Sequence, residues 1–187
     1  MVIVFPQATA EFNEFLTKLI KKSKADLFLN KSLSSYNMKK ISKIVLIILE
    51  NKYVESYLNE YFSYSLLVPE YEILVLKKQT SGSICTILMA APILQNESVV
   101  ITSLDQIVIG KKIEIDKLLN KQKVIVPIIK SKNPSLCYVI KDDLGNVMQL
   151  FEKKAVSNDA VLGIYLFRQF SDFMECCFKL LIKYKGF

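Results

Sequence analysis

The residue best placed for chemistry is Asp105, a carboxylate that follows a short apolar run. Residues 99–101 are β-branched and lead into the polar segment 102–106, which indicates a buried parallel strand ending in a loop. In open α/β sheets, ligands bind beyond the carboxyl ends of the strands, where a carboxylate can hold a cation bound to phosphate. The alternative is that Asp105 only caps the loop, as many loop aspartates do.

Two other short segments carry groups that suit anions or sugars. Gln79, Ser81 and Gly82 stand in a loop of small residues that opens a predicted helix, and amides at a helix N-terminus can bind phosphate. Glu152 and Lys153, with a second lysine after them, end a predicted strand and could grip sugar hydroxyls and a phosphate. For the first segment, the structural alternative is a capped helix whose glycine permits tight packing. For the second, it is a solvated strand end.

The absence of histidine removes several kinds of chemistry at once. With no histidine in the chain, triads, His-ligated metals and imidazole acid–base catalysis are excluded. The four cysteines have no CxxC spacing, which predicts core thiols in a reducing compartment rather than a zinc cluster or a disulfide framework. Without histidine, any reaction must use carboxylates, lysines or a hard cation. No Walker loop or GxGxxG is present either.

Length and composition indicate one globular domain over residues 1–187. Hydrophobic residues make up 51% of the 187, enough for a substantial core. The net charge of +7 suits phosphorylated ligands, nucleic acid or an acidic partner, but the lysine runs lack arginine and interleaved aromatics and are interpreted as solvated helix ends. We therefore expect no nucleic acid partner. No leader and no membrane-spanning run is predicted, so we expect a cytoplasmic protein.

The elements that would position these groups alternate between strand and helix in the first half. Strands are predicted at 2–5, 43–49, 71–76 and from 99, and helices at 10–22, 53–62 and 82–94. Residues 24–40 fit either a strand or a loop. This alternation is typical of a Rossmann-like, doubly wound α/β sheet with right-handed crossovers.

The second half is richer in strands. The patterns predict a short helix at 113–119, strands at 124–129, 136–140, 147–151 and 161–167, and a last helix at 171–184 with Ser171 as its N-cap. Residues 142–146 carry a hairpin-turn signal. One mixed α/β domain is the simplest account.

In their order along the chain, these segments resemble the sugar-phosphate nucleotidyltransferase family. The similarity spans roughly residues 73–174, and its most specific parts are LDQ at 104–106, EK at 152–153 and GIY at 163–165. The resemblance implies a Rossmann-like, GT-A-like α/β/α sandwich with a mixed, mainly parallel sheet. It also implies transfer of a nucleotide from a nucleoside triphosphate to a sugar phosphate, with release of pyrophosphate.

The resemblance further implies roles for individual residues. They are Asp105 for magnesium, Asp105 and Lys153 for the reaction, Gln79, Ser81 and Gly82 for the nucleotide, and Glu152, Lys153 and Gly163 for the sugar phosphate. Such a reaction needs no side-chain nucleophile, because the sugar phosphate attacks and a cation neutralises charge. A chain without histidine could therefore perform it.

Two departures from the family pattern count against activity. The first loop, residues 6–12, has neither the glycines nor the arginine that grip the triphosphate in that family. The chain ends at Phe187, about where the family continues toward a second metal-binding aspartate, so we expect a C-terminally short domain. One carboxylate is a poor magnesium site, and Asp116 or Asp159 could help only if folded close to Asp105.

Three hypotheses follow. The first is a protein related to enzymes that make nucleotide-activated sugars for surface-polysaccharide synthesis, with weak or lost catalysis, an accessory or ligand-binding role, and a protein partner or homo-oligomer. The second is an active, minimal Mg²⁺-dependent nucleotidyltransferase. The third, more distant, is a glycosyltransferase of similar topology, against which the lone Asp105 argues. The glycine-free first loop favours the first.

Overall fold

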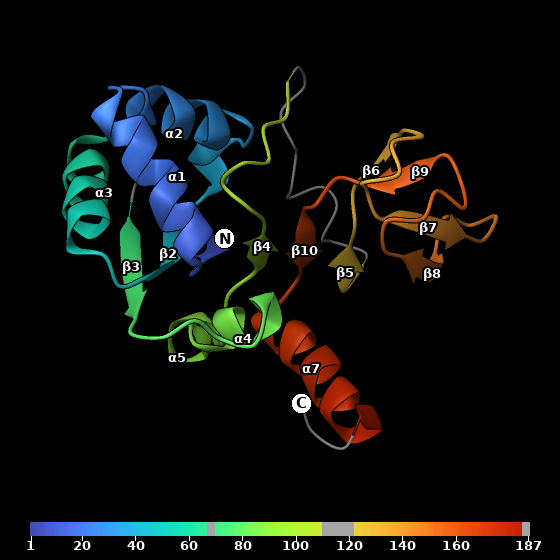
Figure 1. Ribbon diagram of the computed structural model, residues 1–187. Helices are drawn as coiled ribbons and strands as arrows, with labels where there is room; N and C mark the ends of the chain where they lie inside the picture. Colours follow the sequence, from blue (N-terminus) through green and yellow to red (C-terminus); the bar gives the residue numbers. More distant parts are fainter. Residues whose placement is uncertain (67–69, 110–121, 185–187) are drawn as a thin grey trace.

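A computed structural model describes residues 1–66, 70–109 and 122–184. The central element of the fold is a six-stranded sheet (Figure 1). Its strand order is β3-β2-β1-β4-β10-β5. The strands are β1 (Val2–Gln7), β2 (Lys43–Leu49), β3 (Tyr71–Leu76), β4 (Val99–Ile101), β5 (Val124–Ile125) and β10 (Tyr165–Phe167). Strands β1 to β4 are parallel, and β10 runs antiparallel to both its neighbours. The sheet is therefore mixed and mainly parallel, as predicted.

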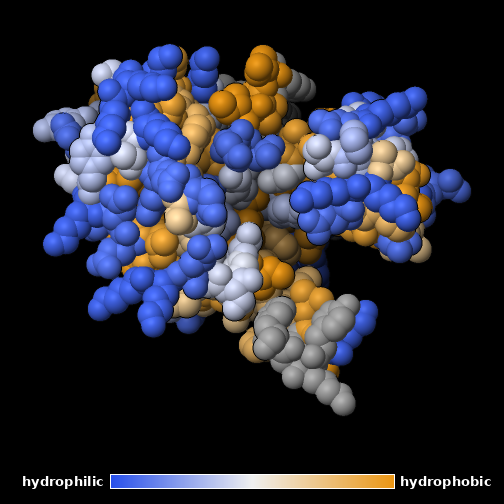
Figure 2. Space-filling model, viewed as in Figure 1, coloured by the Kyte–Doolittle hydropathy of each residue, from blue (hydrophilic) through white to orange (hydrophobic). Residues whose placement is uncertain are grey.

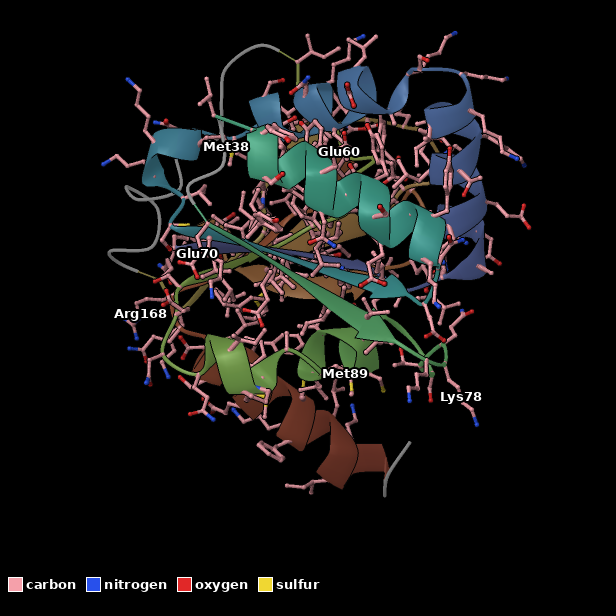
Figure 3. All side chains as sticks on the ribbon, turned by 90° about the vertical axis from the view of Figure 1, so that its left-hand side faces the viewer. Met38, Glu60, Glu70, Lys78, Met89 and Arg168 are labelled. Atoms are coloured by element: carbon pink, nitrogen blue, oxygen red, sulfur yellow. The ribbon has the colours of Figure 1, made fainter. Side chains whose placement is uncertain are left out.

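Helices cover both faces of this sheet. On one face lie α1 (Ala10–Lys21), α2 (Ala25–Ser34) and α3 (Lys52–Tyr64), and on the other lie α4 (Ser83–Leu88), α5 (Ala91–Leu94) and α7 (Phe170–Tyr184). Figure 3 shows the layers from the β3 edge, with Glu60 of α3 and Met89 after α4 on opposite sides of the strands. The predicted α/β/α sandwich is confirmed.

The alternation of side chains along β1 explains the two layers. Ile3 and Phe5 point into the core under α1 to α3, and Val2 and Val4 point into the core over α4, α5 and α7. All four are at most 2% exposed. A parallel strand that is buried on both faces has a continuous run of apolar residues in its sequence. The strands in the first half of the chain were therefore predicted well from sequence.

A second, antiparallel sheet lies beside the helical layers (Figure 1). Its order is β6-β9-β7-β8, with β6 (Ile128–Lys130), β7 (Tyr138–Lys141), β8 (Val147–Phe151) and β9 (Asp159–Val161). The predicted hairpin turn joins β7 to β8. There Asp142 Oδ1 accepts a 2.7 Å hydrogen bond from the Asn146 amide, and Gly145 has a φ of +85°, which glycine adopts without steric cost.

Two segments predicted as single strands are each split between the two sheets. Residues 124–129 form β5 and β6, separated at Pro127, and residues 161–167 form the end of β9 and then β10, separated at Gly163. Proline lacks the amide for a strand ladder, and the φ of +76° at Gly163 turns the chain. Periodicity detected the extended segments but not the change of sheet.

Other boundaries also differ from the predictions. The ambiguous segment 24–40 contains α2 and a 3₁₀ turn, Met38–Lys40, and the predicted helix 82–94 is broken into α4 and α5. Helix α7 begins at Phe170, so the predicted Ser171 N-cap is wrong. Asp172 Oδ2 instead accepts a 3.3 Å bond from the Gln169 amide. The predicted helix at 113–119 lies outside the described residues.

Within residues 1–66, 70–109 and 122–184, no helix is long and apolar enough to cross a membrane.

An ion-pair cluster joins three strands of the second sheet. Asp159 on β9 is 8% exposed and pairs with Lys130 on β6 and, at 3.1 Å, with Lys141 on β7. The pKa of the Asp159 carboxyl is held below its usual 3.8 mainly by the hydrogen bond from Lys130, with a further contribution from the hydrogen bond of Lys141. The carboxylate therefore bridges β6 to β7 across β9.

We expect Asp159→Asn to lower the free energy of unfolding at neutral pH. Because the folded pKa of Asp159 lies below the unfolded value of 3.8, the unfolded state binds more protons at pH values between the two, and the stabilisation is lost as pH falls through the folded pKa. Urea unfolding measured between about pH 7 and pH 2 should show that the difference in free energy of unfolding between wild type and Asp159→Asn shrinks toward the acid end. Asp143→Asn, in the neighbouring turn, is the control. A difference in free energy of unfolding that does not change with pH would contradict stabilisation by the charged Asp159 carboxylate.

Candidate functional site

A cleft of about 650 Å³ opens at the carboxyl ends of β1 and β4. Its walls come from the end of β1, the start of α4, the segment after β4, the passage from β9 to β10, and α7. The molecular surface is hollowed between the lobe of α1 to α4 and the lobe of the second sheet (Figure 2). The cleft thus lies where an open α/β sheet binds ligands.

The segment after β4 is fixed by two side-chain hydrogen bonds. Gln7, at the end of β1 and 9% exposed, donates from Nε2 to Ser103 Oγ at 2.9 Å. Tyr36, fully buried, donates from its hydroxyl to Thr102 Oγ1 at 3.0 Å. Burial raises the pKa of Tyr36 to about 12, so its hydroxyl stays a neutral donor. Both bonds hold residues 102–103 at the floor of the cleft.

The described residues that line this cleft carry no formal charge. The polar ones are Gln7, Thr9, Ser83, Thr102, Ser103 and Tyr165, and the apolar walls include Ile84, Ile87, Phe167 and Phe173. Hydroxyls and one amide beside aromatic and aliphatic walls suit an uncharged polar ring such as a sugar or a base. Phosphate groups are commonly held by Arg, Lys or several backbone amides.

Asp105 lies in an adjoining hollow of about 320 Å³. Gln7 and Thr9 line both cavities, and Glu11 lines the second one together with Asp105, which is exposed. Sequence reasoning missed Glu11. A signal was available, because Glu11 follows β1 as Asp105 follows β4, and the carboxyl ends of parallel neighbours meet at one edge of the sheet.

The described residues do not by themselves make a metal centre. Over the described ranges, no group of three or more His, Cys, Asp or Glu is placed to hold a metal ion. Two carboxylates, Asp105 and Glu11, share a hollow, and Mg²⁺ on one or two carboxylates depends on substrate phosphates for the rest of its shell. Asp159 is held by Lys130 and Lys141 in the second sheet, and Asp116 lies outside the described residues.

The residues expected to bind the nucleotide lie at the rim. Gln79, Ser81 and Gly82 are exposed between β3 and α4, and none of them lines the cleft, whereas the next residue, Ser83, does. Thr80 Oγ1 donates to the Gly82 carbonyl at 3.0 Å. This loop therefore borders the cleft through its last residue.

Of the residues expected to bind the sugar phosphate, the structure brings only one into the cleft. Gly163 lines it, and a Cβ at this position would lie 3.1 Å from the Gln106 side chain. Glu152 and Lys153 follow β8, with side chains 78% and 71% exposed and 4.0 Å apart. Neither lines the cleft or the hollow of Asp105.

Comparison with solved structures identifies the fold. A nucleoside-diphosphate-sugar pyrophosphorylase from Vibrio cholerae RC9 matches with a TM-score of 0.71 at 15% identity, over 97% of this chain and 78% of that one. A UDP-glucose pyrophosphorylase in complex with UDP-glucose matches with a TM-score of 0.66 at 16% identity, over 90% and 76%. An inositol-1-phosphate CTP transferase from T. maritima matches with a TM-score of 0.58 at 12% identity, over 89% and 69%.

The chain therefore has the fold of the sugar-phosphate nucleotidyltransferases, as the sequence resemblance implied. No protein-family model matches the sequence, and no curated protein matches it. The structural similarity extends over most of the chain and establishes its architecture.

Gly163 and Gly145 offer a matched test of the crowding at the cleft. Both have positive φ, +76° and +85°, but only at Gly163 would a Cβ meet another side chain, that of Gln106. We expect Gly145→Ala to lower the free energy of unfolding by about 1 kcal/mol and Gly163→Ala by about 2 kcal/mol. Denaturant unfolding measures both, and adding Gln106→Ala should recover the excess loss at Gly163. Equal losses without recovery would contradict the crowding.

Proposed function

We propose that the chain binds the sugar or base portion of a nucleotide-activated sugar in the cleft, and that its nucleotidyl transfer is weak or lost. The observation that carries this proposal is the uncharged lining of the cleft by the described residues. We further propose an accessory role in making nucleotide-activated sugars for surface polysaccharides. The four cysteines are free, in keeping with the reducing cytoplasm that we expect for this role.

The lining supports binding of a neutral ring. Ser103 and Thr102 are held in place by Gln7 and Tyr36, so their hydroxyl groups are positioned before a ligand arrives, which lowers the entropic cost of binding. The apolar walls, which include Phe167 and Phe173, can cover the face of a sugar or base. A UDP-glucose pyrophosphorylase of the same fold holds UDP-glucose.

The charges around the cleft disfavour a triphosphate. Transfer from a nucleoside triphosphate depends on cations that neutralise the phosphates. The first loop contributes Pro6, Gln7 and Thr9 to the cleft, and Glu11 joins Asp105 in the adjoining hollow. Proline offers no amide to a phosphate, and two carboxylates repel one, so the described surface is better suited to the neutral end of the ligand.

Binding can be tested by filling the cleft. Ser83 is exposed and lines the cleft, whereas Ser81 is exposed in the same loop and does not. We expect calorimetry with nucleoside-diphosphate sugars, including UDP-glucose, to show binding that Ser83→Trp weakens at least about tenfold, by about 1.4 kcal/mol. Ser81→Trp should bind like wild type. No binding by wild type, or equal binding by both variants, would refute the proposal.

A second candidate function is an active, minimal Mg²⁺-dependent nucleotidyltransferase. The observation that favours it is the pair of carboxylates in one hollow, Asp105 with Glu11, which could hold Mg²⁺ together with substrate phosphates. This pair would then replace the two aspartates that the resemblance implies.

Pyrophosphate release separates the two candidates. With a nucleoside triphosphate, a sugar 1-phosphate and Mg²⁺, we expect release at the background rate, because the described lining has no cation to neutralise the triphosphate. Asp105→Ala and Glu11→Gln should then change nothing. Robust Mg²⁺-dependent release that is abolished by either substitution would establish the active enzyme instead.

A further inference from the structure

The second sheet has an edge without the usual protection. β8 pairs with β7 on one side, and no described strand pairs with its other side. Its sequence, VMQLF, has no charged residue and no proline, the devices that commonly block pairing at an edge. An edge strand of this kind presents a row of free amides and carbonyls to a second strand.

The side chains beside this edge are apolar and exposed. Val147 is 45% exposed, Met148 68% and Leu150 45%, and Leu144 in the preceding turn is 88% exposed. Orange and tan side chains are visible among the polar ones on this lobe (Figure 2). Apolar groups that gather along an unpaired edge mark an association surface.

The strand is self-complementary when paired antiparallel about Gln149. A two-fold axis through Gln149 places this residue opposite itself, Val147 opposite Phe151, and Met148 opposite Leu150. Directly opposed residues lie on the same face of a sheet. One face of the new pair would match Met148 with Leu150, and the other would match Val147 with Phe151 on both sides of a central Gln149 pair. A two-fold contact uses the same patch on both copies.

The charges at the two ends of β8 favour the same pairing. The turn before the strand carries Asp142 and Asp143, and the segment after it carries Lys153 and Lys154, with Glu152 offsetting one of these two cations. Hydrogen bonds from the Asn146 side chain and amide lower the pKa of Asp142, which keeps it charged. Antiparallel pairing sets the acidic turn of each copy beside the basic segment of the other, whereas parallel pairing would set like charges together.

We propose that two copies of this chain join through β8, antiparallel about Gln149, so that two four-stranded sheets become one of eight strands. This contact lies on the second sheet, and β8 contributes no residue to the cleft. It is therefore independent of the function proposed above. It leaves each segment 152–154, which follows β8, against the second copy.

Sedimentation and light scattering of the full chain test the contact. We expect a concentration-dependent dimer that becomes monomeric in the double variant Met148→Lys, Leu150→Lys. Ile182→Lys, on α7 and 80% exposed, is the matched control and should remain dimeric. Circular dichroism verifies that all three proteins are folded. A wild-type chain that stays monomeric, alone or while β8 binds another protein, overturns the proposal, as does a dimer that survives the double variant.

Cross-linking tests the register. Cys176 is exposed, so the variants are made in a Cys176→Ser background. Under a mild oxidant, Gln149→Cys should form a disulfide-linked dimer, because directly opposed residues bring their Cα atoms within about 4.5–5.5 Å, a separation that a disulfide spans. Val147→Cys opposes Phe151 rather than itself and should cross-link far less. Equal or reversed yields overturn the register.

Discussion

The structure depends on the burial of β1 between two parallel neighbours. β2 and β4 flank it in the sheet, and its side chains alternate between two apolar cores. The helices are thereby sorted onto two faces, and the carboxyl ends of β1 and β4 meet at one edge. Gln7, the last residue of β1, then bonds Ser103 and lines both cavities at that edge. The site is therefore a direct product of the core.

At this edge, two neighbouring cavities differ in electrostatic character. The larger one is neutral among its described lining residues, whereas the smaller one carries Asp105 and Glu11. A ligand with a neutral ring and a negative phosphate end would meet these two environments differently. Because of this difference in charge between the two cavities, binding of a sugar or base in the larger cavity would be separable from catalysis at a phosphate in the smaller one.

The fold could be predicted from sequence where burial leaves a clear pattern. β2 and β3 are mostly apolar runs and have the predicted limits. β8 also has the predicted limits, but it is exposed, and the turn residues before it marked its position instead of burial. Prediction failed at Pro127 and Gly163, because periodicity reports extended backbone and not the sheet that a strand joins. Both residues are local signals for a break, and only tertiary pairing shows that each marks a passage between sheets.

The site was less predictable because it is assembled from distant segments. Asp105 was expected beyond the sheet edge and lies there, yet its neighbour Glu11 comes from the first turn of α1. Glu152 and Lys153 matched a motif but lie at an exposed strand end outside both cavities. Motif matches report residue types in order, whereas the direction of each side chain depends on packing.

The two passages between the sheets have one more consequence. Leu162 donates from its amide to the Pro127 carbonyl at 2.9 Å, so the chain leaves the large sheet and returns to it at adjacent points. The segment between them is topologically an insertion whose ends already meet. Such a unit can be lengthened, trimmed or exchanged during evolution while β5 and β10 keep their pairing. The large sheet would persist while the inserted lobe diverged.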